Sequence, residues 1–494
     1  MRFLAIEWSV TPQYSFGWGV PLLAAYLFWK RWEDRPTPES IGKNNMLAAA
    51  AILAFVFLPL RLMLEANPDW RILLWTDALV LLGSFLLMIR SIGGQPWLKH
   101  FVIPIAFLLL AAPWPTRAEK FIIETLTHDI AAATVETLNW IGVPALLRGN
   151  IIDLRSASVG VNEACSGIRS VQTILMTALF FGELNRLILV RRIWLVIVAL
   201  GGTIFFNFIR TILLAWTAAT RGVANEAFWH DKIGLFALVA SIALTWAISV
   251  LFSGKRAVLA EEEPNAITIA PRFLSWRAAA TIAIGILSIE AINEIWFRTH
   301  ESKMGPKIDW TISWPPASTG FVRQNLNDDV LTILRCDRGD SGVWKRTDGS
   351  EWTMYFIKWG AGRMAAQLAR GHTPDVCMTG NGFRMVADLG SAVLTTPDLS
   401  LTFEKYEFTS DGKPWFVFFC LAEDRVMTHN PLAGAKDDYL SALKPHSRLR
   451  AVRDGKRFYG QQVFEVAISG YRSAETARAA LEKALPDLVK VHAL

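Results

Sequence analysis

A cysteine near the middle of the sequence stands where its thiol could act as a nucleophile. In the stretch VNEACSGIRS, Cys165 comes just before an expected apolar helix, with Glu163 two residues earlier. The dipole of a helix N-terminus favours the thiolate, which is the reactive form of cysteine. The alternative is that Cys165 is a small apolar residue that only fills space, as most membrane cysteines do.

A second stretch, GTIFFNFIRTILLAW, places an arginine inside an apolar run. Thr203, Asn207 and Arg210 fall on one face of the expected helix. An arginine inside a membrane costs at least about 2.5–3.5 kcal/mol on insertion scales, so it normally has a function or a partner. The alternative is that Arg210 extends its side chain to the nearby membrane surface.

A third stretch, AFWHDKIGLFAL, opens another apolar helix with His230 followed by Asp231. A single histidine at a membrane boundary is usually a packing or solvated residue. However, a thiol, an imidazole and a fixed cation are the groups that acyl transfer needs. The thiolate attacks a carbonyl, the imidazole moves protons, and the guanidinium stabilises negative charge. The three stretches together therefore predict a cysteine-dependent acyl-transfer site with Cys165, Arg210 and His230.

The composition indicates that these residues are carried by membrane helices. Of the 494 residues, 52% are hydrophobic and only 19% are charged, and the apolar excess lies almost entirely before residue 296. We expect an all-α bundle of about eight transmembrane helices over residues 1–297, with an amphipathic helix on the membrane surface within 114–167. No cleavable signal peptide is expected. The predicted membrane helices are near 15–30, 46–64, 72–90, 98–113, 168–184, 193–217, 233–253 and 276–296.

The loop charges predict the orientation of the bundle. Lysines and arginines gather in connections 30–45, 185–192 and 254–277, which the eight-helix count places on one side. The positive-inside rule makes that side cytoplasmic. Cys165, Arg210 and His230 then all lie at the outer face, together with the tail. The net charge of +6 is explained by these loops, so no nucleic-acid partner is expected.

The tail, residues 298–494, is predicted to be a soluble α+β domain. Helical patterns at 361–370 and 473–486 accompany alternating segments, which predict a mainly antiparallel sheet. We find no CxxC pair, metal-ligand cluster or nucleotide loop, so neither a metal nor a cofactor is expected. The expected strands are VLTILRC, EWTMYFIKW, LTFEKYEF, WFVFFCL and QQVFEVAI.

The motifs EACSGIRS, NFIRTILLAW and WHDKIG, in this order over roughly residues 15–255, resemble the exosortase/archaeosortase family of membrane transpeptidases. The resemblance implies cleavage of C-terminal sorting signals of the PEP-CTERM type on exported proteins, at the periplasmic face of a bacterial inner membrane. It makes Cys165 the nucleophile, Arg210 the stabiliser of the thiolate or transition state, and His230 the acid/base. Asn207, Glu163 and Asp231 are supporting residues.

The tail resembles the exosortase-associated C-terminal domain found in exopolysaccharide-linked systems. The resemblance is carried by ARGHTPDVCMTGNGF, with His372, Pro374 and Cys377 followed by glycines. His372 and Cys377 could form a second reactive pair. The favoured alternative is a structural loop in which Cys377 is bridged to Cys336 or Cys420.

The expected substrates are exported proteins whose C-terminus carries a short polar motif, a hydrophobic helix and a basic tail. Cleavage would pass through an acyl-thioester on Cys165, which an amine or another nucleophile would resolve. Two rival functions stay open on the sequence alone. One is a non-proteolytic exopolysaccharide polymerase, ligase or export component, which would not need Cys165, and the other is a non-catalytic assembly protein.

Overall fold

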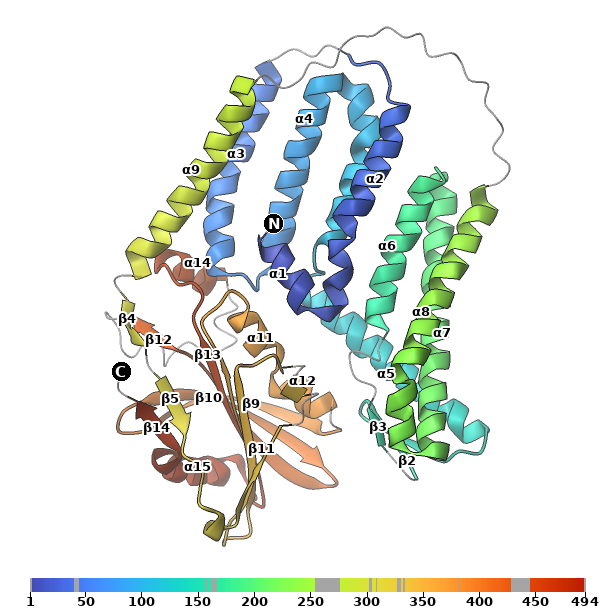
Figure 1. The fold of residues 1–494 in the computed structure, drawn as a ribbon. Coiled ribbons are helices and arrows are strands. Elements are labelled where there is room, and N and C mark those ends of the chain that lie inside the picture. Colours follow the sequence, from blue (N-terminus) through green and yellow to red (C-terminus); the bar gives the residue numbers. More distant parts are fainter. Residues whose placement is uncertain are drawn as a thin grey trace. The chain divides into compact units, whose positions relative to one another are not determined.

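The computed structural model of the chain combines a helical region with a strand-rich C-terminal region (Figure 1). The residues that it describes are 2–39, 44–155, 158–160, 167–253, 276–301, 304–307, 309–326, 330–331, 334–380, 382–427 and 445–492.

Contacts within the chain divide it into two compact units. The first comprises Met1–Leu60 and Arg71–Leu287, and the second comprises Arg61–Trp70 and Ser288–Leu494. The turn between the second and third predicted membrane helices thus belongs to the same compact unit as the C-terminal region. The division into domains 1–297 and 298–494 stays a prediction.

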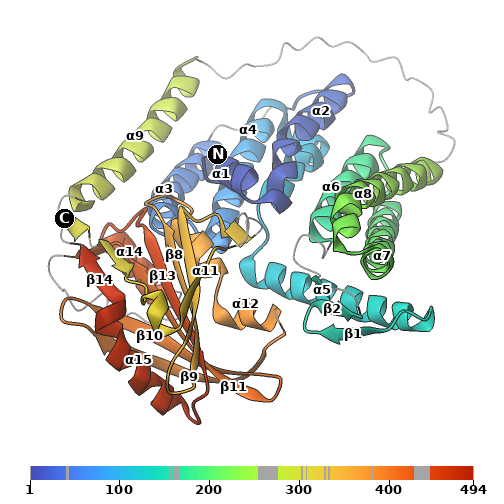
Figure 2. The same cartoon turned by 60° about the horizontal axis from the view of Figure 1, so that its bottom comes forward.

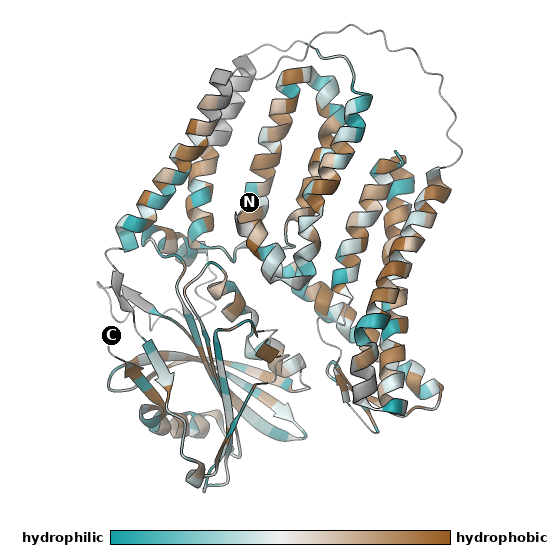
Figure 3. Cartoon of the chain, in the orientation of Figure 1, coloured by the Kyte–Doolittle hydropathy of each residue, from teal (hydrophilic) through white to brown (hydrophobic). Residues whose placement is uncertain are grey.

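The first unit is mainly helical. Its longer helices carry mostly apolar residues along their length (Figure 3). Its elements are α1 (Arg2–Val10), η1 (Pro12–Trp18), α2 (Val20–Glu33), α3 (Asn44–Ala66), α4 (Arg71–Ala106), η2 (Phe107–Ala111), α5 (Thr116–Trp140), β1 (Ala145–Arg148), β2 (Ile151–Leu154), β3 (Ser158–Gly160), α6 (Ile168–Leu184), α7 (Leu189–Arg221), α8 (Val223–Ser253) and the start of α9 (Trp276–Glu301).

Helices lie at all eight predicted membrane positions, although α4 contains two of them. A non-helical residue, Gly94 at φ 79°, interrupts α4 between its two apolar legs. A side chain at Gly94 would also collide with Glu39, so glycine is required there on two counts. By length and composition, three described segments can cross a membrane: Arg71–Ala111, Leu189–Arg221 and Phe228–Ser253. The chain is therefore a membrane protein, while eight crossings are not confirmed. One reason is length, because the 14 residues of α2 span only about 21 Å of a ~30 Å hydrocarbon core.

The segment between the fourth and fifth predicted helices contains a small sheet that we did not predict. The amphipathic helix α5 ends at Trp140, and β1, β2 and β3 then form a three-stranded antiparallel sheet. Gly149 and Asn150 connect β1 to β2, and Gly149 has φ 63°. A Gly-Asn pair between short strands is a recognised hairpin signal, and it could have revealed this turn.

The second unit is built on a seven-stranded antiparallel sheet of order β6-β7-β8-β13-β11-β10-β9. The strand predicted at 330–336 is wrong, because the residues described there are helical or in a turn and β7 begins only at Arg338. The other four predicted strands are confirmed as β8, β10, β11 and β13. The elements are β4 (Met304–Lys307), β5 (Asp309–Ile312), η3 (Ala317–Thr319), β6 (Phe321–Gln324), β7 (Arg338–Lys345), β8 (Glu351–Trp359), α11 (Ala365–Gly371), α12 (Pro374–Gly380), β9 (Arg384–Thr395), β10 (Ser400–Ser410), β11 (Lys413–Glu423), β12 (Arg425–Met427), α14 (Pro445–Arg453), β13 (Gln461–Ser469), α15 (Ala474–Leu488) and β14 (Val489–His492).

Alternation along the strands gives this sheet two apolar faces. On one face, Phe418 and Phe464 pack beneath Leu481 of α15. On the other, Phe419 and Val463 lie in a second cluster with residues of α11. The two views show α11 and α12 on the opposite side of the sheet from α15 (Figures 1 and 2). Each phenylalanine buried in this way contributes roughly 1.5–3 kcal/mol, so both covered faces stabilise the unit.

Candidate functional site

Arg210 on α7 and His230 on α8 meet in the first unit. Arg210 Nη2 lies 3.1 Å from His230 Nε2, and His230 Nδ1 lies 3.1 Å from Asp231 Oδ1. A guanidinium can only donate hydrogen bonds, so Nε2 must accept and the ring proton must sit on Nδ1, where Asp231 accepts it. The three side chains therefore form a directed chain in which the imidazole is neutral. The structure brings together two of the three predicted catalytic residues and one supporting residue.

The buried face of α7 sets the position of Arg210. Thr203 and Asn207 are both buried, as the predicted polar stripe requires. The Thr203 hydroxyl donates to the Ala199 carbonyl of its own helix at 2.8 Å. Arg210 is only half-buried, because it lies beside this stripe and turns toward α8. The stripe thus packs inside the bundle and leaves the guanidinium at its edge.

Gly167, directly before α6, approaches the part of α7 that carries Asn207. Gly167 precedes α6 with φ 78°, a conformation that favours glycine. A Cβ placed on Gly167 would lie 2.6 Å from Asn207 Nδ2, so only glycine allows this close approach. Asn207 is three residues before Arg210, and residues at this spacing are neighbours on a helix surface. The start of α6 therefore lies beside the Arg210 region of α7.

A second glycine makes room for the guanidinium. Gly234 follows His230 by one helical turn, and a Cβ there would lie 3.3 Å from Arg210 Cζ and Nε. Sequence reasoning missed this role, although the spacing of four residues within WHDKIG was available as a signal. The buried Arg210 Nε has no hydrogen-bond partner within the part of the chain that the structure describes. This N–H could donate to a negatively charged oxygen or sulfur placed beside it.

Cys165 and Glu163 lie outside the described residues. The elements on either side of them are described: β3 ends at Gly160, and α6 begins at Ile168. Residues of α5 and β2, including Leu138 and Ile152, form a core cluster with Ala215 of α7. The elements that flank the cysteine segment are therefore anchored on the helix that carries Arg210.

A buried ionic network fixes the beginning of α5. Arg71, the first residue of α4, forms ion pairs with Glu7 at 3.0 Å and with Glu119 of α5. Tyr14 and Gln13 also donate to Glu119. Removing one partner from such a buried network usually costs about 3–5 kcal/mol, because the other charge stays buried. This network is therefore a scaffold for α5 and the sheet that follows it.

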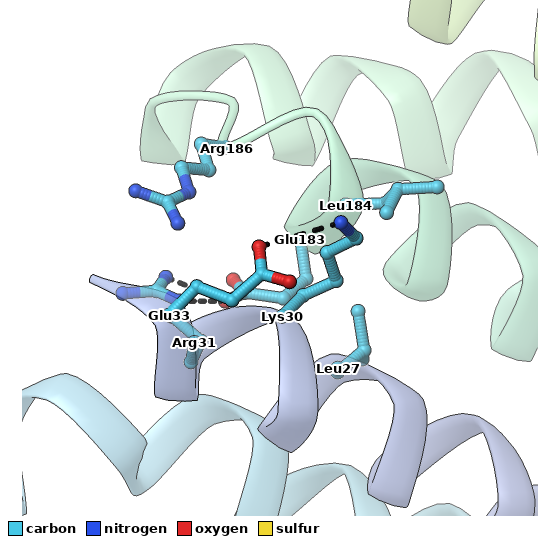
Figure 4. Close-up of a pocket in the computed structure, with 7 residues that line it drawn as sticks. All are labelled: Leu27, Lys30, Arg31, Glu33, Glu183, Leu184 and Arg186. Carbon is cyan, nitrogen blue, oxygen red and sulfur yellow. Dashed lines mark hydrogen bonds and ion pairs between the residues drawn. The ribbon is translucent and has the colours of Figure 1, made fainter. Parts of the chain in front are cut away.

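A separate charged cluster lies at the far end of α6. Glu183 pairs with Arg31 of α2 at 2.7 Å and with Arg192 of α7 at 2.8 Å. Figure 4 shows Arg31 reaching Glu183 and Lys30 reaching Glu33 beside a cavity of about 260 Å³. The 17 residues of α6 put this cavity about 25 Å from Gly167. Its lining contains no thiol and no imidazole, so it is not part of the Arg210 site.

In the second unit, His372 and Cys377 belong to the segment that covers one sheet face. His372 follows α11, and Cys377 lies in α12; both are half-buried. Cys336, Cys377 and Cys420 are all present as thiols. Cys420 belongs to the core on the opposite sheet face, which argues against the bridge between Cys377 and Cys420. Nowhere in the described chain do three His, Cys, Asp or Glu side chains gather as metal ligands would.

The long apolar helices and the hydrogen-bonded side chains of Arg210, His230 and Asp231 define a membrane protein with a polar site at the edge of a helical bundle. Residues 8–247, which cover most of the helical region, match the family model of the transmembrane exosortases. Arg210 and His230 lie within the matched range, whereas the C-terminal unit lies almost entirely outside it. No curated protein and no solved structure matches the chain.

Proposed function

We propose that the chain is a membrane cysteine transpeptidase that cleaves C-terminal sorting signals from exported proteins. Cys165 is the nucleophile, Arg210 stabilises negative charge, and His230 transfers protons. The observation that carries the proposal is the hydrogen-bonded chain from Arg210 through His230 to Asp231. The match of residues 8–247 to the exosortase family model supports the same function.

The close packing of Gly167 supports the assignment of Cys165. Two residues of chain span at most about 7 Å, so covalent geometry keeps Cys165 near Gly167. Gly167 in turn lies against Asn207, one helical turn from Arg210. A thiol brought beside the Arg210 guanidinium would be favoured as the thiolate.

The proposed reaction has two halves. The Cys165 thiol gives its proton to His230 Nε2, which requires the Arg210 guanidinium to move from that nitrogen to the developing anion. The thiolate then attacks the scissile carbonyl carbon, and Arg210 donates to the oxyanion. Collapse of the tetrahedral intermediate breaks the C–N bond, and His230 protonates the departing amine. An incoming amine or water attacks the resulting thioester and regenerates the thiol.

Asp231 has a positioning role in this scheme. Its carboxylate accepts from Nδ1 and so holds the tautomer whose Nε2 can take a proton. Asp231 is 99% exposed, so water screens its charge. Its contribution is therefore smaller than that of a buried carboxylate in the same role.

Signal cleavage in membranes tests the proposal. Cys165→Ala should abolish processing of a tailed substrate at unchanged protein abundance, with Cys336→Ala as the control thiol. Arg210→Lys should be severely impaired although it keeps the charge, because lysine lacks the planar fork of donors. Processing at the wild-type rate in Cys165→Ala would end the cysteine mechanism. Near-normal processing in Arg210→Lys would show that Arg210 only reaches toward the membrane surface.

A further inference from the structure

The cavity at the end of α6 opposite Gly167 is a feature that the proposed transpeptidase does not use. It has a volume of about 260 Å³, and its wall combines charged side chains with the apolar side chains of Leu27 and Leu184. Sites that enclose a drug-sized molecule have volumes of roughly 300–1,000 Å³. The cavity is therefore large enough for a small polar group and too small for a whole lipid.

One buried carboxylate in the wall holds two guanidinium groups. Glu183 is only 2% exposed, and it pairs with Arg31 of α2 at 2.7 Å and with Arg192 of α7 at 2.8 Å. Both arginines are mostly buried as well. Two cations against one anion leave a positive charge in excess in a place that water reaches poorly. Because a buried charge needs a counter-ion, this cluster favours an anion in the cavity.

The other two cations of the wall have only exposed partners (Figure 4). Lys30 pairs with Glu33 at 3.5 Å, and both side chains are about half exposed. Arg186 pairs with Asp34, and these side chains are also about half exposed. Exposed ion pairs contribute little, so an incoming anion can replace either carboxylate. Among these described side chains and the buried cluster, four cations face three carboxylates.

The backbone at Arg186 has a conformation that glycine adopts more easily. Arg186 follows α6 by two residues and has φ 49°, in the left-handed region. Its N–H donates to the Glu183 carbonyl, and the Leu187 N–H donates to the Gly182 carbonyl, both at 2.9 Å. Glycine is the usual residue in such a turn at the end of a helix. The chain therefore places a cation at the cavity in a position where another residue would form the turn with less strain.

The surface beside the cavity has the character of a protein at the headgroup level of a membrane. Trp29, next to Lys30 on α2, and Trp194 near the start of α7 are each about half exposed. Indole rings prefer the boundary between headgroups and acyl chains. Ile188 and Leu189, which lead into the possible membrane span of α7, are still more exposed. An anion in the cavity would thus lie where the phosphate of a phospholipid lies.

We propose that this cavity binds the phosphate of an anionic glycerophospholipid. Lys30 and Arg186 donate to the phosphate oxygens in place of their exposed carboxylate partners, and Arg31 and Arg192 supply the excess positive charge behind them. The acyl chains lie on the exposed apolar surfaces of α2 and α7. Basic pockets between membrane helices are suited to lipid headgroups in this way. The site is about 25 Å from Gly167 and does not depend on the transpeptidase activity.

The test measures lipid binding by native mass spectrometry of the full-length protein in a neutral detergent. The probe is dioleoylphosphatidylglycerol, and dioleoylphosphatidylcholine is the zwitterionic control. The anionic lipid should bind saturably and more tightly than the control. Each basic side chain beside the phosphate should strengthen binding about fivefold, so Lys30→Gln/Arg186→Gln should weaken it about thirtyfold.

Arg35→Gln/Arg191→Gln is the matched control. It removes the same charge from the same end of the helices, but neither residue lines the cavity. The affinity of this double variant for the anionic lipid should stay close to the wild-type value. An equal loss of affinity in both double variants would show a general attraction to basic surface residues and would overturn the proposal.

Glu33→Gln should tighten binding of the anionic lipid about fivefold, because it removes the carboxylate that competes for Lys30. Damage to the fold cannot produce such a gain. Equal retention of the two lipids, unchanged affinity in Lys30→Gln/Arg186→Gln, or weaker binding in Glu33→Gln would each overturn the proposal. Displacement of the lipid by millimolar inorganic phosphate would show a site for free phosphate and would overturn the assignment to a lipid.

Discussion

Arg457 is the central cation of the second unit, and its removal should strongly destabilise that unit. Its guanidinium lies 2.8 Å from Glu294, 2.6 Å from Glu301 and 3.5 Å from Glu65. Arg457 is 6% exposed and Glu65 only 2%, so water cannot replace the lost ion pair. Breaking a buried pair of this kind costs about 3–5 kcal/mol.

Arg298 provides a matched control. It pairs with the same Glu294 at 2.7 Å but is 73% exposed, and exposed pairs contribute about 0–1 kcal/mol. A loss of 1 kcal/mol shifts Tm by roughly 2–4 °C in a unit of this size. Arg457→Ala should therefore lower the Tm of the second unit by roughly 6–20 °C, and Arg298→Ala by no more than about 4 °C.

The assay is thermal unfolding of the full-length protein in detergent, with limited proteolysis to assign the transition to the second unit. A Tm for Arg457→Ala that equals the Tm for Arg298→Ala would refute the reasoning from burial.

Three further predictions concern Gly234 beside Arg210, Glu465 of β13, and the pair His372 and Cys377 of the second unit. Gly234→Val should lower processing about a hundredfold by displacing the nearby guanidinium, whereas Gly201→Val, with open space around its Cα, should leave the rate near wild type. Glu465 titrates at about 7 when folded and near 4.5 when unfolded, so its contribution to stability declines as pH rises from 4.5 to 7. Glu465→Gln should therefore raise the free energy of unfolding at pH 8, by up to roughly 3 kcal/mol, but not at pH 4, and an equal effect at both pH values would contradict this. His372→Ala/Cys377→Ala in the full chain should keep most of the processing activity, and complete loss in a folded variant would give the second unit a catalytic role.

From the sequence, Arg210 and His230 were predicted to belong to one site at one face of the membrane, and the structure places Arg210 Nη2 3.1 Å from His230 Nε2. An arginine in an apolar helix needs a partner, and the partner had to stand at the same end of a neighbouring helix. The predicted strands at EWTMYFIKW and QQVFEVAI were equally clear, since both alternate regularly and both lie at the centre of the sheet. In all of these segments a strong hydrophobic pattern, or a clear break in one, carried the prediction.

Other features depend on contacts that no local pattern carries. Glu65 and Asp69 looked like ordinary loop residues, but the structure buries them against arginines that lie hundreds of positions later. The segment VLTILRC has strand-like residues, yet part of it is helical beside the sheet, so packing overrode its propensity.

The most direct test of the proposed function is to trap the acyl-enzyme. The full-length protein is incubated in membranes with a tailed substrate, quenched in acid and digested for mass spectrometry. The proposal predicts a substrate-derived acyl group on the peptide that contains Cys165, released by hydroxylamine and absent from Cys165→Ala. An adduct on Cys377 instead, or substrate cleaved at the wild-type rate by Cys165→Ala, would contradict it.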